Sequence, residues 1–193
     1  MKLHLGCQRV ILPNWINLDL EDLPGVDIQD DARTLNKIPN ESCDIIYASH
    51  VLEHFGRHEF ESVLKTWNKK LKLFGILRLS VPDFEKAVAW YNKTKQILDI
   101  VGSACGGQRT KNDYHKMIFD KPTLTEILTK CGFGNICEWD WRKTEHCEFD
   151  DYSQAYLPHM DKEKGMLMSL NLEASKIRDA TIENMHFGKS PWQ

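Results

Sequence analysis

The sequence lacks the features that mark several specialised classes of protein. Its 193 residues hold no internal repeat, no low-complexity segment and no apolar run of the roughly eighteen residues that a membrane-spanning helix needs. The start of the chain, Met1–Gly6, does not open the long apolar stretch of a secretory signal peptide. We therefore expect a cytoplasmic protein with no membrane partner.

Paired cysteines and an excess of positive charge are also missing. The six cysteines are scattered, and no two are spaced as Cys-x-x-Cys, which predicts free thiols in a reducing compartment. The formal net charge is -3, so nothing favours a nucleic-acid partner. The length and a hydrophobic content of 41% predict one domain over residues 1–193 with a single core. Nothing in the sequence indicates the oligomeric state.

Short strand patterns alternate with helical patterns along the chain. The strand patterns are Leu3–Leu5, Trp15–Leu20, Val26–Ile28, Asp44–Ser49, Ile76–Val81, Ile136–Trp141 and Met166–Leu172. Helical periodicity covers Glu59–Leu73, Phe84–Val101 and Pro122–Cys131, whereas Gly102–Lys116 is typical of a loop and the tail beyond Lys189 of a loosely held end. This alternation predicts an α/β fold in which the sheet is covered on both faces.

Ligands of such sheets bind beyond the carboxyl ends of the parallel strands. The residues expected at those ends are Gly6-Cys7, Asp19, Asp31, Ser49-His50 and Pro82-Asp83. The links between the first three strands are shorter than the dozen or so residues that a crossover helix usually needs. We therefore expect the helices in this part of the sheet to be missing or reduced to turns.

The same segments, taken in order, resemble the class I S-adenosylmethionine-dependent methyltransferases, in particular a compact branch similar to type 11. The matching segments are Leu3–Cys7, Asn14–Asp19, Asp31-Ala32, Asp44–His54 and Leu71–Asp83, followed by His115, Phe119 and Leu124–Phe133. The resemblance extends over most of the chain. It implies a Rossmann-like three-layer sandwich with a mostly parallel seven-stranded sheet, truncated N-terminal helices and a late antiparallel strand over Met166–Leu172.

The resemblance also implies a cofactor, S-adenosyl-L-methionine, and a set of residues that contact it. These are Gly6, Cys7, Asp19, Leu20, Asp31, Ala32, Ser49 and His50. Asp19 is expected to accept hydrogen bonds from the ribose hydroxyls, as the acid of dinucleotide sites does. Asp31 and Ala32 are expected to flank the adenine. Gly6 has no side chain, so backbone N–H groups of its turn can approach the methionine part closely.

Three histidines, His50, His54 and His58, are spaced four residues apart, with Glu53 among them. On a continuous helix they would share one face, and two histidines four apart can chelate a metal ion. Gly56 interrupts the segment, and no further cysteine or carboxylate has a suitable spacing. The sequence therefore predicts no metal site.

Histidines are also the expected catalytic residues. A hydroxyl acceptor must lose its proton during methylation, and histidine can take it near neutral pH. The candidates are His54, His50 and His115, with Asp83 a weaker one. A small-molecule or glycan acceptor is expected, although a protein side chain is also compatible with the sequence. Two other classes stay open: an inactive module that binds a nucleoside or partner protein, and a metal-dependent hydrolase built on the histidine run.

Overall fold

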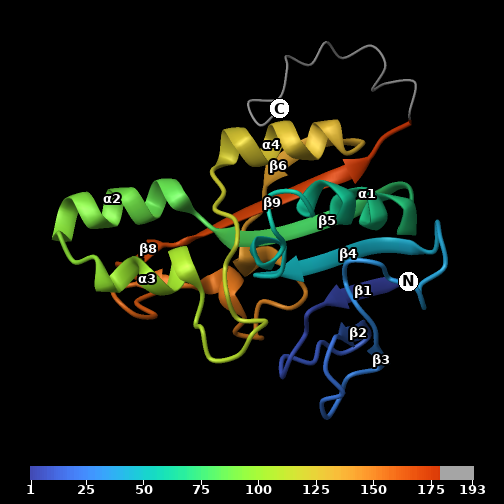
Figure 1. Cartoon of the computed structure of the whole chain (residues 1–193), viewed down its shortest axis with the longest axis horizontal. Coiled ribbons are helices and arrows are strands. Elements are labelled where there is room, and N and C mark those ends of the chain that lie inside the picture. The colour runs from blue at the N-terminus through green and yellow to red at the C-terminus, as the bar shows by residue number, and fades with distance from the viewer. Residues whose placement is uncertain (179–193) are drawn as a thin grey trace.

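The computed structural model describes residues 1–178, and the tail beyond Lys189 lies outside this range (Figure 1). Its main sheet has seven strands in the order β3-β2-β1-β4-β5-β9-β6. They are β1 (Lys2–Leu5), β2 (Ile16–Asp19), β3 (Ile28–Gln29), β4 (Cys43–Ser49), β5 (Leu71–Pro82), β6 (Phe133–Glu138) and β9 (Ser169–Lys176). All pairings among β1 to β5 are parallel, whereas β9 is antiparallel to both β5 and β6. The mostly parallel Rossmann-like sheet and its late antiparallel strand are confirmed.

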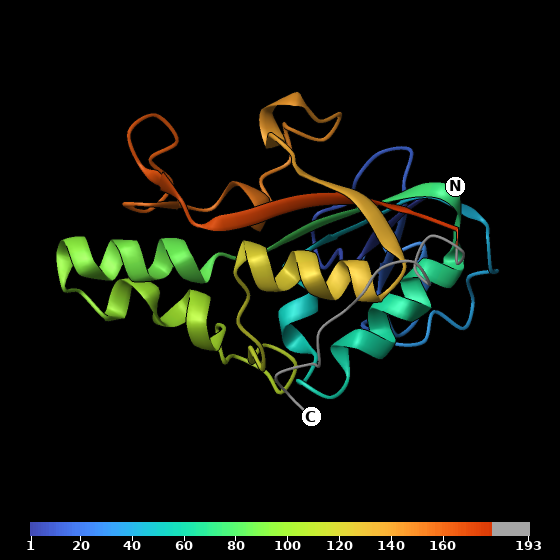
Figure 2. The same ribbon diagram turned by 90° about the horizontal axis from the view of Figure 1, so that it is seen from above.

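Two helices, α1 (Phe60–Lys70) and α4 (Lys121–Lys130), cover one face of this sheet (Figure 2). Their apolar positions recur every three or four residues and are buried, as with Leu64 and Trp67 of α1. They pack on strand residues that face the same way, such as Ile46 and Leu79, which have no exposed surface. This face therefore holds the main hydrophobic core, and it fixes the positions of the strand ends.

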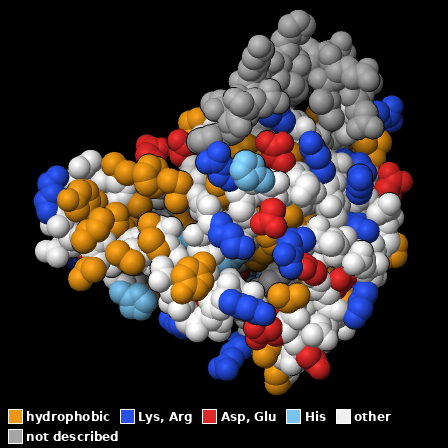
Figure 3. All heavy atoms as spheres, viewed as in Figure 1, with side chains coloured by type: hydrophobic (Ala, Val, Ile, Leu, Met, Phe, Trp, Pro, Cys, Tyr) orange, Lys and Arg blue, Asp and Glu red, His pale blue; other side chains and the backbone are white. Residues whose placement is uncertain are grey.

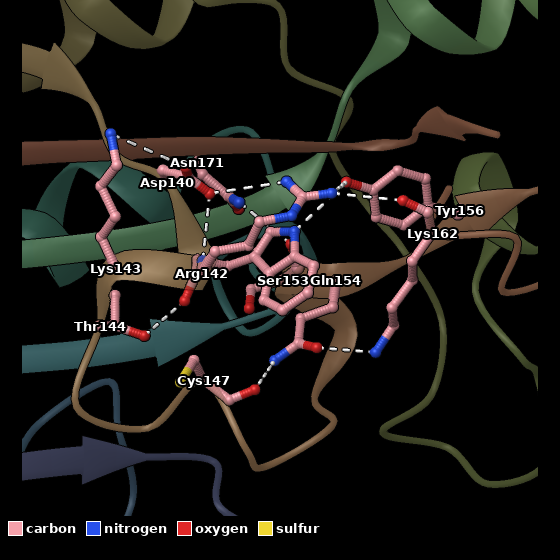
Figure 4. Close-up of polar contacts among 11 residues, drawn as sticks. Asp140, Arg142, Lys143, Thr144, Cys147, Ser153, Gln154, Tyr156, Lys162 and Asn171 are labelled. Atoms are coloured by element: carbon pink, nitrogen blue, oxygen red, sulfur yellow. Dashed lines mark hydrogen bonds and ion pairs between the residues drawn. The ribbon is translucent and has the colours of Figure 1, made fainter. Parts of the chain in front are cut away.

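The opposite face is covered by irregular chain, which Figure 2 shows on the side away from α1 and α4. Segment 139–165 supplies most of this layer, with the short 3-10 helices η2 (Trp141–Lys143) and η3 (Tyr152–Gln154) and a two-stranded sheet of β7 (Tyr156–Leu157) and β8 (Met166–Leu167). Figure 4 shows how polar contacts hold it together. Arg142 donates to the Tyr156 hydroxyl at 3.0 Å, and Gln154 accepts from Lys162 at 2.8 Å while donating to the Cys147 carbonyl at 3.0 Å.

No helix lies between β1 and β4 in the described chain, which confirms the truncated N-terminal helices. The buried Asn17 side chain stabilises the loop from β1 to β2 instead. Its amide nitrogen donates to the carbonyls of Leu12 and Trp15, and its oxygen accepts from the Leu12 N–H at 2.9 Å and contacts His4 Nδ1 at 3.1 Å. One side chain thus satisfies loop groups that a crossover helix would have bonded internally.

Several element boundaries differ from the sequence predictions. The first helix ends at Lys70 because the chain enters β5 at Leu71, which already pairs with Cys43. The helix expected over Phe84–Val101 is divided into α2 (Phe84–Thr94) and α3 (Leu98–Cys105), since Lys95 adopts a left-handed conformation. Two strands also shift along the chain: β6 begins before the expected Ile136–Trp141 pattern, and Met166–Leu172 is split between β8 and β9.

Helices α2 and α3 project beyond the end of the sheet in both ribbon views (Figures 1 and 2). Hydrophobic side chains gather on this projection in Figure 3. The exposed large ones are Phe84, Val88, Tyr91, Ile97, Leu98 and Val101. None of the described helices has the length and hydropathy needed to cross a membrane.

Replacing Asn17 by alanine should destabilise the protein, because buried N–H and C=O groups of the loop from β1 to β2 lose their partners. We expect the free energy of unfolding to fall by about 2–4 kcal/mol in urea titrations. Asn92→Ala is the matched control, since Asn92 is exposed on α2. It should change the free energy of unfolding by less than about 0.5 kcal/mol. Equal values for the two variants would contradict the role given to Asn17.

Acid should destabilise the protein through His146, whose ring is buried against Tyr47 at 4.4 Å and has no hydrogen bond on either nitrogen. Burial, reinforced by Arg78, lowers the pKa of His146 from 6.5 to about 4. As the pH falls, the unfolded chain protonates this imidazole at a higher pH than the folded protein does. The contribution of neutral His146 to the free energy of unfolding is therefore complete above pH 6.5 and is lost as the pH falls toward 4. Thermal unfolding measured across this pH range tests the assignment. In His146→Phe the melting temperature should fall less steeply with decreasing pH than in the wild type. The exposed control His159→Phe should behave as the wild type does, and an equally steep fall in His146→Phe would refute the assignment.

Candidate functional site

The carboxyl ends of β1, β2 and β4 meet where the strand order reverses, and the expected cofactor residues lie there. Gly6 makes the turn after β1 with a φ of +61°, and a Cβ atom on it would lie 2.6 Å from Val51 Cγ2. Only glycine fits both the backbone conformation and the close contact. The next residue, Cys7, is buried, and its N–H donates to the Leu18 carbonyl at 3.2 Å. The turn is therefore tied to β2.

Asp19 ends β2 and faces the same turn, with only 6% of its surface exposed. One carboxylate oxygen accepts from the Gln8 N–H at 2.8 Å and the other from the Glu21 N–H at 3.0 Å. An ionised carboxylate offers about four acceptor positions, so about two remain for hydroxyl donors of a ligand. The next residue, Leu20, is 45% exposed beside it. This acceptor capacity fits the ribose contact that the sequence implied for Asp19.

Asp31 is engaged in a different way. Its carboxylate pairs with the Arg33 guanidinium through three contacts of 2.6 to 3.0 Å, which lower the pKa of Asp31. The Ala32 carbonyl accepts from the Trp67 indole N–H at 2.7 Å. Acceptance of the adenine amine by Asp31 would therefore compete with Arg33, a partner only two residues away that the sequence analysis did not consider.

Ser49 and His50 end β4. The Ser49 hydroxyl is buried without a hydrogen bond. The His50 backbone has a φ of +52°, and its Nε2 lies 3.0 Å from the Ser169 hydroxyl of β9. Burial lowers the pKa of His50 to about 3, so its ring is neutral at physiological pH. Both residues thus place polar groups at the predicted edge of the sheet.

The histidine run does not form one helix. The 3-10 helix η1 (Leu52–His54) ends where Phe55 becomes extended, and His58 is exposed. His54 instead meets His115 from the loop after α3, with ring centroids 4.9 Å apart in an edge-to-face arrangement. Burial lowers the pKa of both rings. Together with Glu53, these histidines form a group whose candidate ligand atoms all lie within 4.8 Å of one another, and we call it the Glu-His-His cluster.

Glu53 is the residue that sequence reasoning undervalued. Its side chain has no exposed surface, and neither carboxylate oxygen has a hydrogen bond. Oε1 lies 3.2 Å from His50 Nδ1 and 3.8 Å from His115 Nε2, and burial raises the pKa of Glu53 to about 8. Its backbone carbonyl accepts the N–H groups of Lys116 and Met117, which holds the His115 loop in place. The sequence did carry a signal for this role, since Glu53 stands between His50 and His54 directly after a strand.

Asp83, the weaker catalytic candidate, caps α2. Its carboxylate accepts from the Lys86 N–H at 3.2 Å, and its own N–H donates to the Met168 carbonyl at 2.9 Å. Burial raises its pKa. These contacts give Asp83 a structural role, because it is the N-cap residue of α2, the helix that follows β5.

Comparison with known proteins agrees with the fold described above. Residues 10–79 match a family model described as a methyltransferase domain. No curated protein sequence matches the chain significantly. An S-adenosylmethionine-dependent methyltransferase from Archaeoglobus fulgidus shares the fold with a TM-score of 0.57 and 17% identity, over 91% of this chain and 85% of that one.

Two further solved structures share the fold at similar levels. The 1,6-didemethyltoxoflavin-N1-methyltransferase of Burkholderia thailandensis, solved with 1,6-didemethyltoxoflavin and S-adenosylhomocysteine, has a TM-score of 0.55 and 13% identity over 92% of this chain and 71% of that one. The CurJ carbon methyltransferase has a TM-score of 0.54 and 14% identity over 92% of this chain. This chain covers 48% of that protein, about half of its length.

Gly6→Ala should destabilise the protein and weaken cofactor binding together, because the substitution imposes left-handed backbone strain and a clash with Val51. We expect a loss of about 2–4 kcal/mol in the free energy of unfolding. Gly102→Ala is the matched control, since a Cβ atom on Gly102 in α3 meets nothing within 4 Å. It should be neutral or stabilise by up to about 1 kcal/mol. Urea titration measures both variants, and a free energy of unfolding of Gly6→Ala equal to that of the wild type would contradict the packing argument.

Proposed function

We propose that this chain, a class I S-adenosylmethionine-dependent methyltransferase, methylates a hydroxyl group of a small-molecule or glycan acceptor. The observation that carries the proposal is the single edge of the sheet that presents both Asp19 and the histidines. Asp19 ends β2 with spare acceptor capacity, while His50 follows β4, the strand on the other side of β1. A cofactor on Asp19 and an acceptor beside the histidines would then be neighbours.

S-adenosylmethionine, when bound, supplies an electrophilic methyl group, so the chain itself has to bind, align and handle a proton. The Gly6 turn and Asp19 would hold the cofactor, with Leu20 against its exposed side and Ser49 at its methionine end. The Asp31-Ala32 segment would meet the adenine once Arg33 releases the Asp31 carboxylate. This assignment uses the residues that the sequence implied.

The histidines would take the acceptor proton. Their pKa values are lowered by burial, so the rings are neutral near pH 7 and each can act as a base. A pKa of about 3 makes His50 a poor base, which favours His54 and His115. Since both rings lie against Glu53, the acceptor hydroxyl would sit over the Glu-His-His cluster.

One alternative is a module that binds a nucleoside or a partner protein without catalysis, and the missing helices between β1 and β4 of the described chain favour it. Such a module would bind adenosine and S-adenosylmethionine alike, whereas a methyltransferase should prefer the complete cofactor. Calorimetry with both compounds separates these possibilities. For either function we place the chain in the cytoplasm, because its six cysteines are free and thiols persist in a reducing compartment.

Asp19→Ala should weaken S-adenosylmethionine binding by about 1.5–3 kcal/mol, roughly tenfold to 150-fold in Kd, because buried ribose hydroxyls would lose a charged acceptor. Isothermal titration of wild type and variant measures the difference. Circular dichroism checks that the variant is folded, since the Gln8 and Glu21 N–H groups also lose their acceptor. Asp22→Ala is the control, because Asp22 is exposed in the following loop. Equal affinities of Asp19→Ala and wild type would remove Asp19 from the site.

A further inference from the structure

The protons on the two histidines of the Glu-His-His cluster can be assigned from their neighbours. His54 Nδ1 lies 3.1 Å from the Tyr114 carbonyl, and His115 Nδ1 lies 2.9 Å from the Ser103 carbonyl. A carbonyl oxygen only accepts, so each Nδ1 carries the proton. The Nε2 atom of each neutral ring is then an unprotonated lone pair. The Nε2 atom of His115 lies 3.8 Å from Glu53 Oε1, and one ring nitrogen of His54 belongs to the same group of atoms within 4.8 Å of one another.

His50 brings a further lone pair to the same place. The Ser169 hydroxyl donates to the Tyr152 carbonyl at 2.6 Å, so it can only accept from His50 Nε2 at 3.0 Å. The proton of His50 is therefore on Nε2, and Nδ1 faces Glu53 Oε1 at 3.2 Å without one. His50 Nδ1 and His115 Nε2 thus both face Glu53 Oε1 as acceptors, and the Glu53 oxygens have no hydrogen bond at all. A cation bound among these atoms would give the Glu53 carboxylate the partner that it lacks.

We propose that Glu53, His54 and His115 bind a divalent transition-metal ion, with zinc the best match to two imidazoles and one carboxylate. Ligands about 2.1 Å from a tetrahedral ion are separated by roughly 3.4 Å, so the 3.8 Å between Glu53 Oε1 and His115 Nε2 closes with a small movement. Both ligating rings already donate their second nitrogen to a backbone carbonyl. This is the outer-shell contact that orients metal-binding histidines.

Three protein ligands leave a fourth position open, which distinguishes catalytic from structural zinc sites. On the function proposed above, the acceptor hydroxyl would occupy that position. A bound ion would lower the pKa of the hydroxyl and hold its oxygen as the nucleophile. The proton would then leave to solvent water, because His54 and His115, the bases considered above, would be occupied as ligands. The spacing of His50, His54 and His58 hid this site, because its third ligand comes from a distant loop and its carboxylate from within the run.

The competing occupant is a proton on Glu53, donated to His50 Nδ1. The two occupants differ in what Glu53→Gln does. Glutamine has the shape of a protonated glutamate and can donate from its amide, but it is a much weaker metal ligand than a carboxylate. The test uses full-length protein stripped with a chelator and dialysed, then titrated with Zn²⁺ alone.

We expect one Zn²⁺ per chain, a higher melting temperature at saturating zinc, and visible absorption bands of tetrahedral Co²⁺ when cobalt is substituted. Glu53→Gln and His115→Ala should each weaken zinc binding by about a hundredfold or more. His58→Ala should bind zinc as the wild type does, since His58 is exposed and outside the cluster. Circular dichroism of each variant serves as the check that it is folded.

Failure to bind zinc, or equal binding by Glu53→Gln and wild type, would overturn the metal site. If S-adenosylmethionine still binds in that case, the methyltransferase proposal stands and Glu53 is a buried neutral acid. If zinc binds but S-adenosylmethionine does not, the metal site stands while the proposed function fails. The two proposals are therefore separable in one set of titrations.

Discussion

The parallel pairing of β1 with β2 on one side and β4 on the other is the constraint on which the rest of the structure depends. It brings Gly6, Asp19 and Ser49 to one edge of the sheet, and every proposed contact to cofactor or acceptor starts from that edge. Parallel strands normally require a crossover helix, and here the chain has only a short loop between β1 and β2. The buried amide of Asn17 makes this possible, because it supplies the loop with both donors and an acceptor.

The two faces of the sheet differ in the chemistry of their side chains. The face under α1 and α4 is filled by aliphatic side chains in a continuous core. The other face carries polar and aromatic groups, such as His4, Tyr47 and Asn171, beneath irregular chain. Buried polar atoms without hydrogen bonds, including those of Ser49 and Glu53, occur near the carboxyl ends of the strands. Unsatisfied groups there cost stability, which is expected where a ligand supplies the missing partner.

Periodicity, link lengths and strand-end topology were sufficient to predict an α/β sheet, the missing N-terminal helices and the positions of Gly6 and Asp19, whereas the seven strands and the late antiparallel strand were implied by the family resemblance. Element boundaries were harder, because pairing overrides helical propensity at Leu71 and a left-handed residue divides α2 from α3 at Lys95. The Asp31–Arg33 pair escaped prediction because a local ion pair leaves no periodic signal. His115 could be named as a candidate, but its contact with His54 depends on how the loop after α3 folds back. No spacing in the sequence encodes that contact.

Two carboxylates at this edge illustrate how environment assigns a role. Asp19 accepts two backbone N–H groups and keeps free acceptor positions for hydroxyl donors. Glu53 has no donor of any kind and faces imidazole nitrogens, so an anion there is tolerated only beside a cation. The same functional group therefore keeps spare acceptor positions beside backbone donors at one position and lacks any hydrogen bond at the other. On the proposals above, that difference assigns the cofactor to Asp19 and the acceptor to the Glu-His-His cluster.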